Sequence, residues 1–391
     1  MPKAIAKRIE AHNAGRDAEL MAVKFAAMKQ DAFLFLRGSC QLFYEDLSVS
    51  SLPASPKVWC CGDLHWLNFG AYKGDNRLTY FDLTDFDETC LAPVSWDLVR
   101  FLTSALVGGK ILGLDRAKIK PLLSAFLDGY RSALVGGKAR WLERELTEGM
   151  IGQLLTKLES RTRKKFLSSR VETVKGKRRL IVDPKKIQPL KKGRFEQLSE
   201  FMKGYAKQQE DPRFFRLLDA AQRIAGTGSL GLERYLLLVE GRGSPNENFL
   251  LDMKLQPGSA VVAARKIPQP KWKSEAERVA VTQNLAQTAT QALLQAVQFD
   301  GRSFLLRELM PVNDKIDLAK GQGKDLEQTI HAMGELVGWA NLRTASRRGS
   351  ASAEELVAFG RDAKWGNTLV SCAHECADQT EKQWREFAEK S

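Results

Sequence analysis

The chain has few cysteines and no long hydrophobic run, and each of these absences narrows the class of protein. The six cysteines among 391 residues show no disulfide-framework spacing, which favours a reducing compartment. No segment approaches the roughly 18 consecutive apolar residues of a transmembrane helix. The N-terminal residues mix charge into every turn and lack the apolar centre of a signal peptide. We therefore expect a cytoplasmic protein with no membrane span.

The positive charge of the chain is concentrated in one segment. Hydrophobic residues make up 43% and charged residues 27% of the sequence, which is typical of one large or two medium domains. The net charge is +13, and residues 157–194 alone hold fifteen Lys or Arg against three acidic residues. This segment, predicted to be a hairpin, is either a docking surface for an anionic partner such as nucleic acid, anionic lipid or a phosphorylated acceptor, or a solvated face.

An Asp and an Asn five residues apart near the start of the chain carry the first chemical signal. They are Asp63 and Asn68 in CCGDLHWLNFG, a loop predicted to lead into a β-hairpin. Phosphoryl transfer from ATP needs a carboxylate that orients and deprotonates the acceptor, and oxygen ligands for Mg²⁺. We predict Asp63 as the base, Asn68 as a metal ligand, and His65 as the residue that fixes the loop by hydrogen bonding.

The predicted hairpin delivers two more carboxylates in the sequence TDFDE. Asp85 and Asp87 are predicted metal ligands, since Mg²⁺ prefers one or two carboxylates together with substrate phosphates. Asp82 is an alternative to Asp85. A purely structural interpretation is that Asp63 and Asn68 shape a turn while Asp85 and Asp87 cap the next helix.

A glycine-rich segment and a lysine supply the second signal. The segment GTGSLG contains Gly226, Gly228, Ser229 and Gly231 and matches G-x-G-x-x-G, whose backbone amides can approach phosphates closely. We predict a helix over 195–224 before it and a strand after it, an order that disfavours a Rossmann unit. Lys254 on the next strand is the predicted phosphate-binding lysine. Its expected carboxylate partner is Glu277 rather than Glu275, in a helix predicted from Ser274 to about Val297.

These residues resemble the protein-kinase-like superfamily, especially aminoglycoside and choline-type phosphotransferases, whose catalytic loop reads H-G-D-x-H-x-x-N and is followed by D-F-[DE]. Over nearly the whole chain, RGSCQLFYEDL, GDLHWLNFG, LTDFDETCLAPVSWDLVR and GTGSLG also resemble the uncharacterised bacterial family catalogued as domain of unknown function 2252. The resemblance implies ATP and Mg²⁺ as cofactors and Asp97 as a buried helix carboxylate that braces the catalytic loop. Cys61 stands where the small phosphotransferases have His.

The order of these elements predicts a circular permutation. Ordinary kinases run from glycine loop to lysine, helix, catalytic loop and metal-binding Asp, whereas here the catalytic loop and the Asp come first. We therefore expect an α+β, two-lobed, kinase-like fold. Its helical catalytic lobe would comprise residues 1–209 and 311–391, and its nucleotide-binding lobe residues 210–310.

Four functions remain open at this point. The leading one is a phosphotransferase with an unidentified acceptor. An AMP transferase on the same fold and an ATP-binding pseudoenzyme are alternatives within the nucleotide-binding class. A binding module for an anionic partner, which would use residues 157–194, belongs to a different class.

Overall fold

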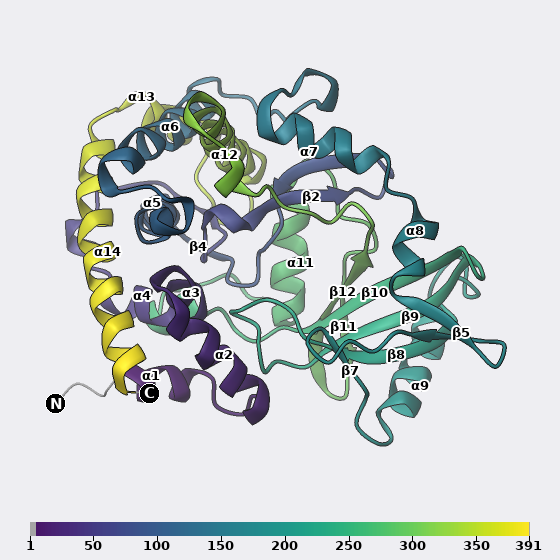
Figure 1. The fold of residues 1–391 in the computed structure, drawn as a ribbon. Helices are drawn as coiled ribbons and strands as arrows, with labels where there is room; N and C mark the ends of the chain where they lie inside the picture. The colour runs from purple at the N-terminus through teal and green to yellow at the C-terminus, as the bar shows by residue number, and fades with distance from the viewer. Residues whose placement is uncertain (1–4, 391) are drawn as a thin grey trace.

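The protein combines a helical part with a six-stranded antiparallel sheet, so it is α+β, as predicted (Figure 1). The structure is a computed structural model that describes residues 5–390. The helical part contains α1 Ile5–His12, α2 Ala18–Gln30, α3 Ala32–Gly38, α4 Cys40–Asp46, α5 Val94–Gly108, α6 Arg116–Val135, α7 Gly149–Glu159, α12 Gly323–Thr344, α13 Ala353–Arg361 and α14 Trp365–Lys390. Every helix within the described residues is too short or too polar to span a bilayer.

The large sheet has the strand order β11-β12-β10-β9-β8-β7. Its strands are β7 Ile187–Gln188, β8 Leu217–Arg223, β9 Arg234–Gly243, β10 Glu247–Leu255, β11 Gln295–Phe299 and β12 Arg302–Leu309. Between β10 and β11 the chain forms α10 Ala260–Arg265 and α11 Glu275–Ala286. The helix α11 runs between the sheet and the helical part (Figure 1). The sheet thus begins before residue 210, the start of the predicted nucleotide-binding lobe.

Both faces of the sheet are covered by elements from residues 163–206, which include most of the basic segment and the helix that follows it. The helix α9 Arg194–Ala206 packs Leu198 and Met202 against one face. On the other face lie α8 Arg163–Ser168 and the hairpin of β5 Val171–Val174 and β6 Lys177–Leu180. Leu167 of α8 contributes to the apolar cluster there. The predicted hairpin in the basic segment is therefore present, and it is anchored on the sheet.

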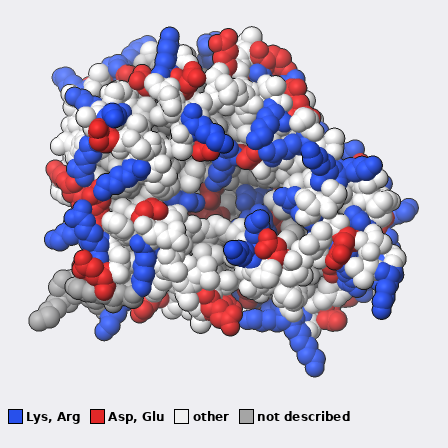
Figure 2. All heavy atoms as spheres, in the orientation of Figure 1, with Lys and Arg blue, Asp and Glu red and all other residues white. Residues whose placement is uncertain are grey.

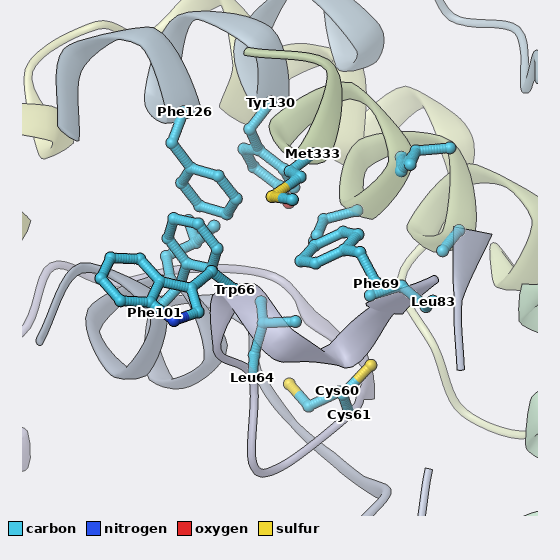
Figure 3. Close-up of a cluster of buried hydrophobic side chains, with 14 of the residues drawn as sticks. Cys60, Cys61, Leu64, Trp66, Phe69, Leu83, Phe101, Phe126, Tyr130 and Met333 are labelled. Atoms are coloured by element: carbon cyan, nitrogen blue, oxygen red, sulfur yellow. The ribbon is translucent and has the colours of Figure 1, made fainter. Parts of the chain in front are cut away.

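Two short strand pairs connect the sheet to the helical core. They are β1 Lys57–Cys60 with β4 Cys90–Pro93, and β2 Phe69–Lys73 with β3 Thr79–Leu83. The helix α5 beside them is buried at every residue, and its Phe101 stacks on Phe126 of α6 with ring centroids 3.6 Å apart. Figure 3 shows Leu64 and Trp66 from the segment after β1 lying beside this aromatic cluster. The loop after β1 is thus anchored in the largest core of the molecule.

Two predicted helices have different bounds in the structure. The prediction of one helix over 195–224 is wrong beyond Ala206, because residues 217–223 pair with β9 as the strand β8. The glycine-rich segment therefore lies between two antiparallel strands. The helix predicted to reach about Val297 ends at Ala286, and β11 follows it. Its predicted N-cap is confirmed, since the Ser274 side chain accepts a hydrogen bond from the Glu277 amide at 3.1 Å.

Candidate active site

A tight turn after β1 is held by one carboxylate of α5. Asp97 accepts hydrogen bonds from the amides of Cys61 and Gly62 at 2.6 and 2.9 Å. Gly62 has a φ of +83°, and a Cβ atom there would lie 2.2 Å from the Glu88 carbonyl oxygen. Only glycine fits this position without displacing the backbone of the next loop. Asp97 therefore braces the loop that carries Asp63.

Asp63 has one oxygen fixed by a buried cation. Arg100, one turn after Asp97 on α5, donates from Nε and Nη2 to Oδ1 of Asp63 at 3.0 and 2.6 Å. The Arg100 side chain is fully buried, and its guanidinium lies over the Phe43 ring. The Asp63 side chain keeps 21% of its surface exposed. Among the described residues, the hydrogen bonds to the Asp63 side chain go to Oδ1, so the second carboxylate oxygen can accept a further donor.

His65 and Asn68 complete the same loop. The Asn68 Nδ2 donates to the Asp63 carbonyl oxygen at 2.9 Å, which turns Oδ1 away from the backbone. Within residues 5–390 no donor reaches this buried Oδ1, although buried acceptors are nearly always satisfied. The His65 Nδ1 accepts from the Leu67 amide at 3.1 Å. Burial and the nearby Arg37 guanidinium lower the pKa of His65, so it is neutral and orders the loop.

The loop between β3 and β4 brings two aspartates with different surroundings. Asp87 contacts the Lys254 Nζ and accepts from Gln256 Nε2 at 2.9 Å. Burial opposes the charge of Asp87, but Lys254 and Gln256 hold its pKa below the usual range. Asp85 accepts only a weak bond, from the Asp87 amide at 3.4 Å, among the described residues. The surrounding protein and the Asp87 charge raise the pKa of Asp85.

Asp82, the alternative to Asp85, is occupied in a structural role. It is fully buried, and its Oδ2 accepts from the Thr288 amide and hydroxyl at 3.0 and 2.8 Å. Arg343 of α12 donates to the same oxygen at 3.2 Å. Asp82 therefore joins β3 to the segment after α11, and Asp85 is the carboxylate with free acceptor capacity.

The residues available for Mg²⁺ are few but suitable in kind. The unpaired Asn68 Oδ1 and the Asp85 carboxylate are hard oxygen donors on consecutive loops. The described residues contain no group of three or more His, Cys, Asp or Glu placed to hold a metal by itself. Two protein ligands fit Mg²⁺, which usually keeps waters and takes the rest of its ligands from phosphates.

The glycine-rich segment connects β8 to β9 and lies against the N-terminal helices. Gly226 and Gly231 have φ values of +81° and +84°, which favour glycine. The Gly228 carbonyl oxygen accepts from Arg16 Nη1 at 2.8 Å and from Lys24 Nζ at 3.2 Å. A Cβ atom on Gly228 would lie 3.3 Å from the Arg37 carbonyl oxygen. The Nε of the same Arg37 lies 3.1 Å from His65 Nε2. Arg37 therefore contacts both the glycine-rich segment and the loop that carries Asp63.

Ser229 shapes the glycine-rich segment through its backbone. Its amide donates to the Gly226 carbonyl oxygen at 3.1 Å, and its own carbonyl oxygen accepts from Leu232 at 3.1 Å. These two bonds form consecutive turns. The segment therefore keeps a defined shape without a ligand.

The structure brings Lys254 to Asp87 and leaves Glu277 apart. The Glu277 Oε2 accepts from the Lys273 amide at 2.6 Å, so its carboxylate completes the cap of α11. The neighbouring Arg278 takes the inward position and donates to the carbonyl oxygens of Thr89 and Asp87 at 2.5 and 2.9 Å. The helix α11 thus contacts the loop between β3 and β4 through Arg278, which binds the backbone of that loop. Lys254 pairs with Asp87, a carboxylate of the same loop.

Several cations of the site were missed by the sequence patterns. They are Arg37, Arg100, Arg278, Arg307 and Lys315, which come from five different segments. Lys315 contacts the Leu67 carbonyl oxygen, and burial lowers its pKa to about 8 despite the Asp85 charge. Only Arg100 carried a usable signal, because it lies three residues after Asp97 on the same helix face. Figure 2 shows a hollow between the helical part and the sheet in which acidic and basic side chains meet.

The comparisons with known proteins show one family. A family model described as "Uncharacterized protein conserved in bacteria (DUF2252)" matches residues 16–390. Comparison with curated proteins and with solved structures found no match. The chain therefore belongs to the DUF2252 family of bacterial proteins.

Proposed function

We propose that this DUF2252 protein is an ATP- and Mg²⁺-dependent phosphotransferase with a circularly permuted, two-lobed kinase-like fold. The observation that carries the proposal is the contact between Lys254 of β10 and Asp87 of the Asp-Phe-Asp loop. These residues are 167 positions apart in the chain. Each came from a separate sequence pattern, and a phosphate-binding lysine beside the metal-binding loop is what phosphoryl transfer requires.

The order of elements in the sheet supports the same proposal. From β8 the chain passes through the glycine-rich segment, β9, Lys254 on β10, and then the helix α11. Lys254 thus lies on the third strand, and the glycine-rich segment joins the first two, as in a kinase nucleotide lobe. The catalytic loop and the Asp85 loop precede all of these elements in the sequence. A circular permutation accounts for this order without any change in the roles of the residues.

In the proposed reaction, Asp63 accepts the proton of the acceptor hydroxyl. Arg100 fixes one of its oxygens, because its buried guanidinium lies within 2.6 Å of the Asp63 Oδ1. The Asn68 amide holds the Asp63 backbone, so base and metal ligand move together. Asp85 and the Asn68 Oδ1 would hold Mg²⁺, which neutralises phosphate charge when bound.

On the donor side, Lys254 binds the phosphates. Its side chain pairs with Asp87 in this structure and is 7% exposed, which fixes it beside the metal-binding loop. The glycine-rich segment offers backbone amides without intervening side chains at Gly226 and Gly228. Base, metal ligands and phosphate-binding groups therefore come from both sides of one cleft.

The first test is the variant Asp63→Asn. We expect Mg²⁺-dependent ATP turnover by the purified protein to fall by about a hundredfold or more, which is typical for loss of a general base. ATP binding, measured by calorimetry, should persist because Asp63 does not contact the donor. Asp317→Asn is the matched control, since Asp317 is 57% exposed and pairs only with Lys320 among the described residues. Unchanged turnover in Asp63→Asn would remove Asp63 from its assigned role.

Product analysis separates the related activities. ATP labelled at the γ-phosphate should label the acceptor, and ATP labelled at the α-phosphate should not. The reverse result indicates AMP transfer. ATP binding without any turnover indicates a pseudoenzyme, and absence of ATP binding rejects all three activities together.

A further inference from the structure

The cleft face of the large sheet is built from three cross-strand rows. Side chains directly opposite one another on paired strands share a face. The strand register defines the rows, counted from the metal loop outwards. The first row is Arg234, Lys254 and Leu305, and the second is Ala221, Leu236, Asp252 and Arg307. The third row is Asp219, Leu238, Leu250 and Leu309. The first row contains Lys254, which faces Asp87. The other two rows continue the same face of the sheet, which we call the ceiling of the cleft.

The apolar part of this ceiling is already covered by the chain itself. Leu236, Leu238 and Leu250 are at most 1% exposed. They pack against Leu167 of α8 and against Val171 and Leu180 of the β5–β6 hairpin. Pockets for nucleobases are usually lined by apolar side chains. Among the described residues, these three leucines offer almost no surface to a base, and only Leu309 at the edge of the outer row is partly exposed.

The part of the ceiling that faces the cleft is strongly cationic. Asp252 stands two residues before Lys254 on the same face, and three arginines surround it. Arg234 donates to both of its oxygens at 2.7 and 2.6 Å, Arg223 lies at 2.8 Å, and the Arg307 Nε lies at 3.4 Å. One carboxylate cannot neutralise three guanidiniums. Burial and the neighbouring Arg234 and Arg307 charges accordingly lower the pKa of Arg223 to about 10.

Two of these arginines have hydrogen-bonding capacity left. Arg223 and Arg307 keep 20% and 24% of their side-chain surface exposed, against 9% for Arg234. Among the described residues, the bond to Asp252 is the only hydrogen bond that the Arg307 side chain makes. Arg307 also acts electrostatically on Asp85, Asp87 and Lys315. Arg307 is therefore close enough to the metal-binding loop for its charge to act there.

We propose that Arg223 and Arg307 bind the polyphosphate of the donor, and that the donor is selected by its phosphates and not by its base. A guanidinium binds phosphate oxygens in a planar, two-pronged geometry and also stacks on any base without distinguishing it. With Lys254, the two arginines extend the phosphate-binding surface along the ceiling where a base slot would otherwise lie. The inference rests on the proposed function, and it adds a donor class: nucleoside triphosphates of either purine, and inorganic tripolyphosphate as a binding mimic.

The experiment is calorimetric titration of the full chain with ATP, GTP and inorganic tripolyphosphate in the presence of Mg²⁺. We expect the three dissociation constants to agree within about tenfold, the free energy of one ordinary hydrogen bond. Arg307→Gln and Arg223→Gln should weaken all three ligands in parallel by about tenfold or more, because charge-assisted bonds to phosphate are lost. Arg216→Gln is the matched control. Arg216 adjoins β8 in the same sheet, is 62% exposed and pairs with Glu240, so its loss should leave all three constants unchanged.

The outcomes separate this inference from the proposed function. Binding of ATP a hundredfold or more tighter than GTP and tripolyphosphate overturns the inference and leaves the phosphotransferase proposal standing. Wild-type affinities in folded Arg307→Gln and Arg223→Gln overturn it as well. Absence of binding by all three ligands rejects both proposals. The comparison of ligands on the unaltered protein decides the question even if a variant does not fold.

Discussion

At the scale of single residues, one helix face organises the loop that carries Asp63. Asp97 holds the backbone of Cys61 and Gly62, and Arg100, one turn later, holds the carboxylate of Asp63. Because α5 is buried along its whole length, neither side chain can move without disturbing the core. The loop is thus positioned by a fully buried helix, which suits the base proposed at Asp63 because a base must meet its substrate in a defined geometry.

The turn at Gly62 gives a stability prediction. Gly62→Ala places a Cβ atom 2.2 Å from the Glu88 carbonyl oxygen at a positive φ, and we expect a loss of about 2 kcal/mol or more in unfolding free energy. Gly113→Ala is the control, because its φ is also positive but nothing lies within 4 Å. Urea denaturation should show a loss of only about 1 kcal/mol for that variant. Equal losses in the two variants would show that the contact with Glu88 adds nothing.

Lys24 gives a prediction about pH. Burial lowers its pKa to about 7 from the ordinary 10.5, although it donates to Asn13 and Gly228. The unfolded chain therefore binds more protons than the folded one between these values, so stability should rise with pH across that window. Lys24→Met removes this contribution. Urea denaturation at pH 7, 8 and 9 should give a steeper rise for the wild type and for the exposed-site control Lys7→Met than for Lys24→Met, and parallel curves would contradict the assignment.

The candidate site residues could be selected from sequence patterns, but their contact partners could not. Asp63 and Asn68 follow from spacing on one loop, and Lys254 follows from its place after a glycine-rich segment. Glu277 was the expected partner of Lys254, but hydrogen bonding at the α11 cap occupies it. Asp252 and Arg307 form a ladder pair only through the register of β10 and β12. No local pattern contains that register, so the arginine group could not be predicted from sequence.

At the scale of elements, the strand β8 shows where local pattern misleads. Residues 214–223 place apolar residues at a spacing that favours a helix, yet residues 217–223 form a strand because β9 is available as a partner. The true arrangement puts the glycine-rich segment between two strands, which the helix prediction obscured. The predicted basic hairpin, in contrast, has turn residues Lys175 and Gly176 with positive φ, so its own sequence sufficed.

The basic segment divides into anchoring arginines and exposed lysines. Arg161, Arg163 and Arg179 make ion pairs with Asp314, Glu308 and Asp219, and so fasten the segment to the sheet and the connection after β12. Its lysines at 175, 177, 185 and 192 are exposed. The arginines therefore account for structure, and the lysines are the part that remains for an anionic partner.

We expect these lysines to govern binding to a polyanion. Replacing Lys175, Lys177, Lys185 and Lys192 by Glu should lower the salt concentration at which the protein elutes from immobilised heparin, because counterion release scales with the number of contacts. Thermal stability should change little, since the four side chains are exposed. A control with Lys110, Lys120, Lys138 and Lys324, exposed lysines of the helical part, replaced by Glu has the same net charge. If both proteins elute alike, the segment is a solvated face and its charge is not a binding site.

At the scale of the whole molecule, the two ends of the chain belong to one structure. Ile5 and Ile9 of α1 share an apolar cluster with Phe387 of α14, and Gln383 of α14 donates to Asp46 of α4. The helices after the sheet thus pack on the helices before it, and both lie beside each other in Figure 1. The α+β class was predictable from element types. The closure of the helical part across the chain ends depends on contacts between residues nearly 380 positions apart, which the sequence does not mark.

This closure predicts that the chain order can be reversed without loss of the site. A permutant that begins at Glu210, in the exposed connection between α9 and β8, and joins the original ends through a flexible Gly/Ser linker restores the order glycine segment, lysine, helix, catalytic loop. We expect it to unfold cooperatively and to keep Mg²⁺-dependent ATP turnover of the same order as the parent, because every site residue keeps its neighbours. The control permutant begins at Gly137, in the exposed connection between α6 and α7, and uses the same linker. If the control folds and the Glu210 permutant does not, the covalent link between α9 and β8 is essential, and the two helical segments do not form an independent lobe around an inserted sheet.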